Sequence, residues 1–444
     1  MFGEPRVSRR AALGFALGAG LGGIRSAGAR GRSPVGGRAS LRVPFGMASV
    51  DPHRLDDPLG ALLGDALFDV LYTRDGVPAL AEAEPEADGD GFVIRVRRGV
   101  TTAEGRPIDA RDVAHSLARA RRLGARAWLG EVPTPERRGN DALRFATRDA
   151  ARLVQALSSP LTAVVPIAFD PERPDGTGAF RAERRDGGFA LVRNARAARG
   201  PALLDEIVIR PAADLASSLR AFEAGTDDVG WLGAGLHAPR PNAKSFDVGS
   251  AAWVVLRVGR DAGAWDAPGV MQRILDGLAP AKLTFLGLGA PWRQERDEGW
   301  GGPSGDLLVR DDAPYLLEVA RTVAALLSRP GHELTPKPTP ARDIATRRGK
   351  REHLLILDLA RPFAPGALGA WTALASVDEP SAATELPKRA PRLAEAPART
   401  LTRTLRVGVV GELRVQGARV PDLALPAGDA GWDLALASRA RRPS

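Results

Sequence analysis

The stretch FVIRVRRGVTTAEGRPIDARDVAHSLARA, residues 92–120, places a strand, a turn and a helix in close succession. Residues 92–96 alternate apolar and polar side chains with the period of two that is typical of a half-buried strand. After a turn that contains glycine and proline, Asp109 is predicted to cap a helix, with Asp112 three residues on, and the helical pattern runs to Gly124. The stretch therefore predicts a strand that leads into an amphipathic helix.

The same alternation of strand-like and helix-like runs recurs along the rest of the chain. It is the pattern of α/β units, which build parallel or mixed sheets with helices packed on them. Charged, proline-rich stretches at 297–312 and 379–398 are predicted to be exposed loops or linkers. The other predicted strands are residues 41–45, 203–209, 228–232, 333–337, 354–359, 404–410 and 415–420, and the other predicted helices are 215–222 and 315–328.

Residues 1–29 are predicted to be a twin-arginine-type signal peptide. A pair of arginines precedes a weakly apolar run of 14 residues, 11–24, which is too short to span a bilayer as a helix. The small residues at 27–29 fit the pattern after which a signal peptidase cuts, so the mature chain is expected to begin near Arg30. The alternative, a first helix of the fold, is disfavoured by the five glycines within residues 14–23.

The composition narrows the class of protein. The chain has 444 residues and no cysteine, which excludes disulfides, thiolate metal sites and the acylated cysteine of a lipoprotein. No run after the signal approaches the ~18 apolar residues that cross a membrane, so an exported, soluble, periplasmic protein is expected. The roughly 415 residues left after cleavage exceed what one hydrophobic core organises, so two or three domains are expected.

The basic charge does not predict nucleic-acid binding. The formal net charge is +9, and without the predicted signal it falls to +6, with 58 basic against 52 acidic residues. Two clusters of basic residues, 119–122 and 347–351, contain no aromatic residues, so they are predicted to be solvated helix or loop faces. No nucleic-acid partner is expected.

Three blocks of sequence between residues 41 and 232 occur in the same order as the motifs of one known family. The first runs from LRV at 41–43 through DPH at 51–53 to LFDVLY at 67–72, and the second runs from PALAE at 78–82 to SL at 116–117. The third contains GTGAF at 176–180, LVRN at 191–194, LLDEI at 203–207 and FEAG at 222–225. In this order the blocks resemble the bacterial extracellular solute-binding proteins of family 5, the binding components of dipeptide, oligopeptide and nickel ABC transporters.

The resemblance implies an α/β fold. This is the two-lobed periplasmic binding protein fold of type II, the Venus-flytrap arrangement, with an extra inserted subdomain. In this sequence the first lobe would comprise residues 40–75, 160–245 and 405–437, the inserted subdomain 76–159, and the second lobe 246–404. Solute would bind between lobes that close about the crossover strands.

The resemblance also implies a function. The chain is expected to be the periplasmic substrate-binding component of an ABC transporter, which captures a peptide-like or other small polar solute in the cleft and delivers it to a membrane permease. A monomer without a cofactor, which meets the membrane only through the permease, is expected. The alternative is a divergent member that acts as a sensor or interaction protein, because the segment between Leu123 and Pro160 is shortened and the second lobe departs from the family pattern. The sequence does not name the solute.

Five residues are candidate solute contacts. His53 ends the Asp-Pro-His turn near the expected cleft mouth, where it either meets solute or stabilises the turn. Trp231, Trp253 and Trp371 fall where the chain is expected to approach or cross the cleft, and each ring could grip a solute or pack in a core. Arg361 follows a strand after which peptide binders of the family commonly place an aspartate for the peptide amino group. A cation there would suit a carboxylate or phosphate instead, unless it is a surface arginine.

Catalysis is not expected. The five histidines include no pair at metal-ligand spacing, and the sequence contains no His-Glu-x-x-His or Gly-x-Ser-x-Gly motif. A periplasmic hydrolase would need a serine–histidine–acid or metal constellation that only folding assembles. The sequence therefore predicts a binding protein without a metal site.

Overall fold

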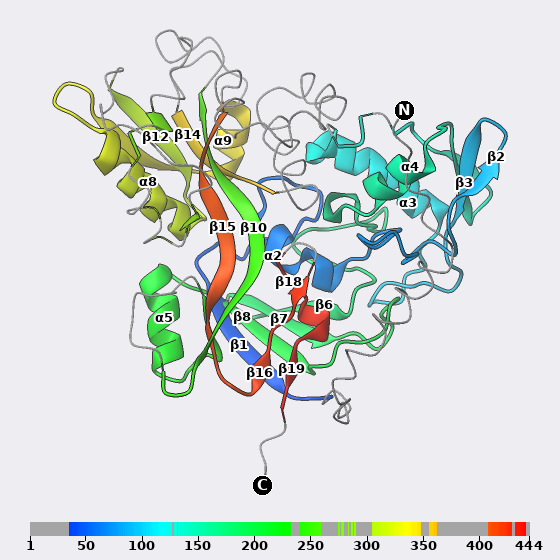
Figure 1. Ribbon diagram of the computed structural model, residues 1–444, viewed down its shortest axis with the longest axis horizontal. Coiled ribbons are helices and arrows are strands. Elements are labelled where there is room, and N and C mark those ends of the chain that lie inside the picture. The colour runs from blue at the N-terminus through cyan, green and yellow to red at the C-terminus, as the bar shows by residue number, and fades with distance from the viewer. Residues whose placement is uncertain are drawn as a thin grey trace, which may run out of the picture. The chain divides into compact units, whose positions relative to one another are not determined.

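An 11-stranded sheet runs through the part of the chain that the structure describes (Figure 1). The computed structural model describes residues 35–126, 128–130, 132–231, 240–258, 274–275, 277–278, 283, 286, 288–289, 304–347, 355–361, 407–428 and 431–440. The strand order is β13-β12-β14-β10-β15-β9-β1-β8-β7-β6, with β11 beside β15. The predicted signal peptide lies outside the described residues.

The sheet has strands on the predicted runs at 41–45, 203–209, 228–232, 333–337, 354–359 and 404–420, with ends that shift by a few residues, together with further strands that were not predicted. The strands of this sheet are β1 (Arg38–Val43), β6 (Phe180–Arg185), β7 (Gly188–Arg193), β8 (Glu206–Pro211), β9 (Val229–Trp231), β10 (Lys244–Val258), β11 (Leu288–Gly289), β12 (Gly305–Arg310), β13 (Leu334–Thr339), β14 (Leu355–Ala360) and β15 (Val407–Arg419).

Two long antiparallel strands, β10 and β15, join the two halves of the sheet (Figure 1). β10 pairs with β14 over residues 253–258 and with β15 over residues 244–257, while the far end of β15 pairs with β9 over residues 417–419. We call β9, β1, β8, β7 and β6 the β1 half, and β13, β12 and β14 the β14 half. The two strand-like runs predicted at 404–410 and 415–420 are one continuous strand within the described residues.

Each half contains parallel strands connected through helices, as the α/β pattern predicts. β1 is parallel to β8 and β9, and β12 is parallel to β13 and β14. In the β1 half, α5 (Leu215–Glu223) connects β8 to β9, and in the β14 half α8 (Pro314–Leu327) connects β12 to β13 and α9 (Ala341–Arg347) connects β13 to β14. α2 (Pro58–Leu67) follows β1 and packs on β10 and β6.

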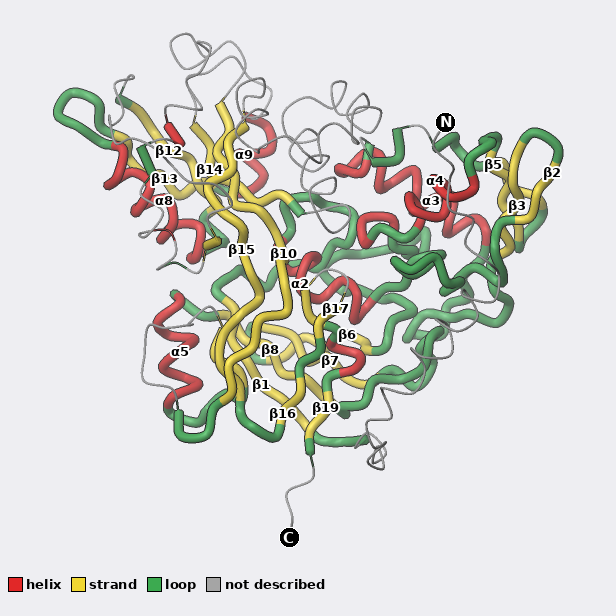
Figure 2. Tube along the Cα trace, viewed as in Figure 1, coloured by secondary structure: helices red, strands yellow, loops and turns green. Residues whose placement is uncertain are grey.

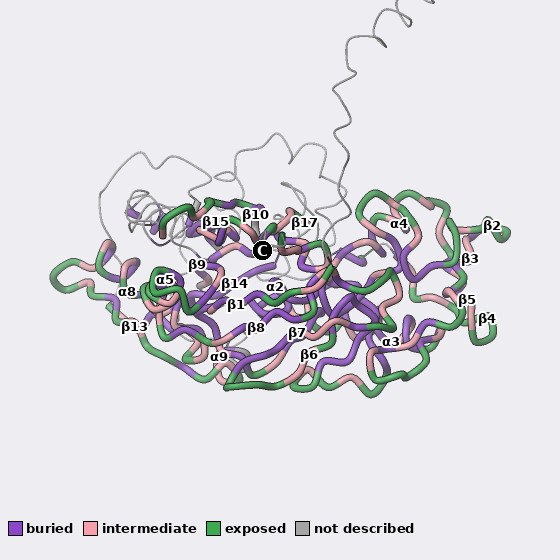
Figure 3. The backbone as a smooth tube through the Cα atoms, turned by 90° about the horizontal axis from the view of Figure 1, so that it is seen from below, coloured by how far each residue is buried: buried purple, intermediate pink, exposed green. Residues whose placement is uncertain are grey.

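The prediction of an exposed loop at 297–312 is wrong for residues 305–310, which form β12. Leu307, Leu308 and Val309 have no exposed surface, because β12 lies between β13 and β14. Every residue of β14 is also buried (Figure 3). The apolar core of β12 is short and is flanked by acidic residues and proline, and that flanking composition concealed it. The segment 379–398 lies outside the described residues.

A second, four-stranded sheet is built from residues 86–145 (Figure 2). Its order is β2-β3-β5-β4, with β2 (Glu86–Asp88), β3 (Gly91–Arg95), β4 (Glu136–Arg138) and β5 (Ala142–Phe145). The helices α3 (Ala110–Ala120) and α4 (Ala150–Leu157) pack with it in a hydrophobic cluster that contains Trp128 and that also includes single residues of β10, β14 and β15. The predicted cap of α3 is confirmed, because Asp109 and Asp112 form a reciprocal capping box.

The remaining described elements are short. A π-helical turn at Arg121–Ala125 continues α3, and 3-10 turns lie at Pro160–Thr162 and Leu434–Leu436. Near the C-terminus β16 (Leu423–Ala424) pairs with β19 (Ser438–Arg439), and β17 (Ala427–Gly428) pairs with β18 (Gly431–Trp432). Among the helices that the structure describes, none combines the length and the apolar character needed to cross a bilayer.

Candidate functional site

The carboxyl ends of β1, β12 and β14 meet at one place in the fold. The loop after β1, residues 44–57, is bonded to the chain that follows each of the other two strands. The Gly46 N–H donates to the Asp312 carbonyl oxygen at 2.5 Å, and the Arg361 N–H donates to the Leu55 carbonyl oxygen at 3.0 Å. Because ligands of open α/β sheets bind outside the carboxyl ends of the strands, this junction is the candidate site.

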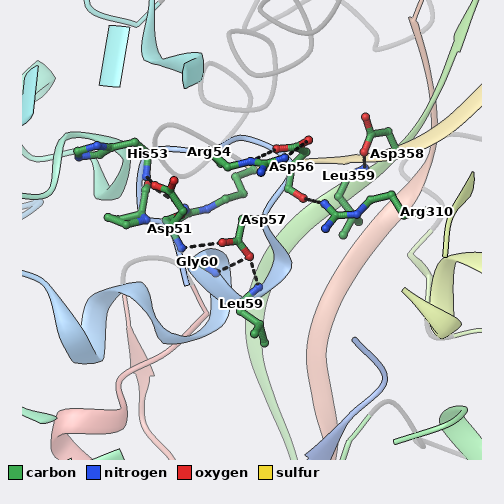
Figure 4. Close-up of polar contacts among 12 residues, drawn as sticks. Asp51, His53, Arg54, Asp56, Asp57, Leu59, Gly60, Arg310, Asp358 and Leu359 are labelled. Carbon is green, nitrogen blue, oxygen red and sulfur yellow. Dashed lines mark hydrogen bonds and ion pairs between the residues drawn. The ribbon is translucent and has the colours of Figure 1, made fainter. Parts of the chain in front are cut away.

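Asp57 organises the end of this loop (Figure 4). It is the N-cap of α2, and its Oδ1 accepts from the N–H groups of Leu59 (2.9 Å) and Gly60 (3.1 Å). Its Oδ2 accepts from the N–H of Asp51 at 2.6 Å, so the same carboxylate closes the loop on the helix. Burial raises the pKa of Asp57, against the opposing effect of these hydrogen bonds.

His53 is fully buried and held in one tautomer. Its Nε2 lies 2.7 Å from the Ala163 carbonyl oxygen, so this nitrogen carries the hydrogen and donates it. Its Nδ1 lies 2.9 Å from Nη1 of Arg119, which can only donate, so Nδ1 is the acceptor. Burial lowers the pKa of His53 to about 4, and the ring is therefore neutral at physiological pH.

Arg119 connects the second sheet's helix α3 to this loop. Its Nη1 and Nη2 donate to Oδ1 (2.8 Å) and Oδ2 (2.7 Å) of Asp51, a bidentate pair with 14% and 3% of the two side chains exposed. Burial alone would raise the pKa of Asp51, but the hydrogen bonds and charge of Arg119 outweigh it and the pKa is lowered. The prediction of a solvated face at 119–122 is therefore wrong for Arg119, because the folded chain supplies a buried carboxylate for it.

Arg361 reaches the same loop from the β14 half. Its side chain is buried, with 3% of the residue exposed, and Nη1 donates to the Pro52 carbonyl oxygen at 2.9 Å. Burial lowers the pKa of Arg361, while the carboxylates of Asp57, Asp65 and Asp51 act in the opposite direction. Arg361 is thus not a surface arginine, and its guanidinium faces protein acceptors.

Arg310, at the end of β12, makes the second cationic contact between the halves. Its Nε and Nη2 donate to the two carboxylate oxygens of Asp312, at 2.8 and 2.7 Å, and Nη1 donates to the carbonyl oxygen of Asp56 (Figure 4). Burial opposes its charge, but Asp312 and Asp56 outweigh burial and the pKa of Arg310 is raised. Asp56 in turn accepts both hydrogen bonds of the Arg54 guanidinium.

The three candidate tryptophans are not gathered at this junction by the described structure. Trp231 has no exposed surface and packs in the core of the β1 half, with ring centroids 5.7 Å from Phe45 and 6.3 Å from Trp432. Trp253 is half-buried on β10 and pairs in register with Ala360, the residue before Arg361. Trp371 lies outside the described residues. His53 and Arg361 are therefore the two candidates that the structure brings to one loop.

A pocket of about 230 Å³ opens next to this junction. It shares Ala163 with the contact of His53, and its charged members include Asp65 and Arg199, whose Nε donates to Asp69 at 2.6 Å. The charge of Asp65 acts on both Arg199 and Arg361. Its lining residues are Asp65, Phe68, Val70, Thr73, Ser158, Pro160, Ala163, Arg199, Ala427, Gly428, Trp432 and Asp433.

Sequence reasoning missed four residues that build the junction. Asp57 carried a usable signal, because an aspartate directly before proline and an apolar run is a helix N-cap pattern. Asp51 lies in the Asp-Pro-His turn that was quoted for the resemblance, but nothing in that turn predicts its pairing with an arginine. Arg119 and Arg310 carried no signal that distinguishes them from surface charges. In the described residues no group of three or more histidine, aspartate or glutamate side chains is placed to hold a metal ion.

The fold and this junction define a periplasmic-binding-protein class, and comparisons with known proteins agree. Residues 75–256 match the family described as bacterial extracellular solute-binding proteins, family 5 middle. This stretch is thus similar to the middle region of family 5, which confirms the resemblance predicted from the sequence. Proteins of this family are non-enzymatic binding proteins, in accord with the prediction that the chain is not an enzyme.

Solved structures match nearly the whole chain. The oligopeptide-binding protein AppA from Bacillus subtilis, in complex with a nonapeptide, is 13% identical with a TM-score of 0.69, and the match covers 92% of this chain and all of that one. AgaA from A. tumefacien R10, in complex with agropinic acid, is 16% identical with a TM-score of 0.71 over 92% and 99% of the chains. NikA from Staphylococcus aureus, in complex with Ni(L-His)2, is 12% identical with a TM-score of 0.66 over 90% and 99%.

These matches confirm the predicted α/β periplasmic binding protein fold. A search of curated protein sequences finds no match to the chain.

Proposed function

We propose that this protein is the substrate-binding component of an ABC transporter, which captures a small polar solute between the two halves and delivers it to a membrane permease. The observation that carries the proposal is the connection of the halves by β10 and β15 in one sheet, with the carboxyl ends of β1, β12 and β14 facing one another across it. Two long strands can bend, which is what hinged closure requires, although one hydrophobic cluster contains residues of both halves, such as Leu41 of β1 and Leu357 of β14.

The comparisons support this proposal without naming a solute. The matched structures hold a nonapeptide, agropinic acid and a nickel–histidine complex, which are small and polar but otherwise unlike one another. We propose the same broad class for this chain, together with export by the N-terminal signal, a monomeric state and the three-part division at residues 76–159 and 246–404.

The solute is proposed to bind at the junction, between the two halves, and to extend into the neighbouring pocket, whose lining contains no residue of the β14 half. Asp65, Arg199 and Asp433 place charges of both signs on the pocket wall, and Phe68 and Trp432 supply apolar surface, a combination suited to a zwitterionic or chelated solute. The five residues predicted from the sequence remain proposed members of the site.

The geometry of these candidate residues suggests that they have different roles in the site. The side chains of His53 and Arg361 donate hydrogen bonds to backbone carbonyl oxygens, so they are proposed to shape the site. The half-buried ring of Trp253 has surface left for solute.

Thermal unfolding of the mature protein tests the function. A library of peptides, opines, sugars and metal chelates is screened, and a true solute at ~100 times its dissociation constant should stabilise the protein by about 2.7 kcal/mol. Native mass spectrometry of the exported protein would identify a solute that survives purification. Failure of every compound to shift the midpoint, with no co-purified solute, would refute transport binding.

The second candidate function is that of a sensor or interaction protein. It is favoured by the direct contacts of the two halves at Gly46 with Asp312 and at Arg361 with Pro52, since these already join the strand ends. A solute that shifts the midpoint would count against it. A protein partner that binds at the strand ends without any solute would support it.

A further inference from the structure

The guanidinium of Arg361 lies in a notch that is built by the β1 half. Nη1 is 2.9 Å from the carbonyl oxygen of Pro52 and 3.5 Å from that of Asp51, and both carbonyls belong to the loop after β1. The main chain of Arg361 is fixed as well, because its N–H donates to Leu55. One residue of the β14 half therefore makes its polar contacts with the opposite half.

The floor of the notch is the helix α2, which presents glycine at two positions four residues apart. Such positions lie on the same face of a helix. A Cβ added to Gly60 would come within 3.0 Å of Nη1, and a Cβ added to Gly64 would lie 3.7 Å from Nη2. The missing side chains leave room for a flat guanidinium against the helix backbone.

Three carboxylates make the notch suited to a cation. Asp57, Asp65 and Asp51 each favour the charge of Arg361, in that order of strength. Asp57 is held in place by its cap on α2, and Asp51 by the bidentate contact with Arg119. The carboxylates of Asp57 and Asp51 are thus positioned by other contacts and do not depend on Arg361 for their placement.

We propose that this notch is a guanidinium site that the chain fills with its own Arg361, and that the filled site is a latch that holds the β14 half on the β1 half in the absence of solute. Opening then requires the guanidinium to leave the notch. A lysine would latch less well, because an ammonium is more strongly hydrated than a guanidinium and lacks the flat shape that fits against Gly60 and Gly64. The consequence for solute uptake rests on the proposed function, but the latch itself does not.

Hydrogen exchange of the mature protein without solute tests the latch. The amides of residues 44–57 and 355–361 report the contact, because the N–H groups of Gly46 and Arg361 cross between the halves. Arg361→Ala should make both segments exchange faster and should enlarge the radius of gyration in X-ray scattering, and Arg361→Lys should do so to a smaller extent. Arg321→Ala, at an exposed arginine of α8 in the same half, is the matched control and should behave as the wild type.

Chemical rescue separates a guanidinium site from loss of packing. Methylguanidinium should restore slow exchange in Arg361→Ala, and methylammonium at the same concentration should not. Wild-type exchange and scattering in Arg361→Ala would overturn the latch, and failure of methylguanidinium to restore protection would overturn the assignment of the notch.

Two further points keep the outcome decisive. If Arg361→Ala does not fold, Arg361→Lys is measured in its place: faster exchange at the two segments supports the latch, and unchanged exchange overturns it. Because no solute is present, failure of the proposed transport function would appear in the compound screen and would leave these measurements unaffected.

Discussion

Replacement of His53 by asparagine should remove a large part of the acid sensitivity of this protein. The ring is buried and neutral in the folded state, with Nε2 bonded to Ala163 and Nδ1 bonded to Arg119. In the unfolded chain the pKa returns to its ordinary value of 6.5, whereas in the folded protein it is about 4. The unfolded state therefore binds more protons as the pH falls below 6.5, and the folded state loses stability.

The size of the effect follows from the two pKa values. Full protonation of the unfolded state at low pH would cost the folded protein about 3 kcal/mol, since one pKa unit corresponds to about 1.4 kcal/mol. Between pH 7.5 and pH 5, where the folded ring is still mostly neutral, the loss is about 2 kcal/mol. The stability is thus lost progressively from pH 6.5 down to about pH 4 and is constant below the folded pKa.

Urea unfolding at several pH values between 5 and 7.5 measures this loss, with the free energy of unfolding taken by linear extrapolation. His53→Asn should be less stable than the wild type at pH 7.5, because it lacks the imidazole hydrogen bonds, and this deficit should shrink by about 2 kcal/mol at pH 5. The pKa of Asp51 is lowered from its ordinary value of 3.8, so this carboxylate stays ionised over this pH range, and Asp57 is present in both proteins without an influence from His53. A deficit of His53→Asn that stays constant from pH 7.5 to 5 would refute the neutral buried ring.

Two further predictions concern the same junction. Arg119→Leu removes one partner of a buried bidentate pair and leaves Asp51 uncompensated, so urea unfolding should show a loss of about 3–5 kcal/mol; a loss below about 1 kcal/mol would mean that the pair is solvated. Gly64→Ala should raise the free energy of unfolding by about 0.5–1 kcal/mol, because its Cβ would meet only Nη2 of Arg361, at 3.7 Å, and alanine favours a helix. Gly60→Ala should lower it, because its Cβ would lie 2.2 Å from the carbonyl oxygen of Asp51, and equal effects of the two substitutions would contradict the notch geometry.

The local elements were largely predictable because their signals are contained in short windows. Apolar periodicity located α3, α5 and α8, and the aspartate at 109 carried the capping pattern that the structure contains. β12 was missed because three apolar residues between charged neighbours give no clear period. Only its position between two other strands buries it.

The candidate site was predictable in part. The Asp-Pro-His turn and the residue after β14 were singled out from the sequence, but their chemistry was not. Whether Arg361 meets a solute, the solvent or the protein depends on which carbonyls and carboxylates lie within about 3 Å of it. The carbonyl oxygen to which Arg361 donates at 2.9 Å belongs to Pro52, 309 positions earlier in the chain.

The sequence by itself determined the α/β class, the family resemblance and the positions of α3, α5 and α8 and of strands such as β1, β8 and β14, because local periodicity, caps and turns are written in neighbouring residues. Only the tertiary structure decided that Arg119 is paired, that His53 is neutral and that Arg361 is buried against α2. The reason is physical: a charge or a pKa is set by burial and by partners within a few ångströms. The partners of Arg119 and His53 come from distant parts of the chain, and those of Arg361 are reached only when β10 and β15 bring the two halves of the sheet into contact.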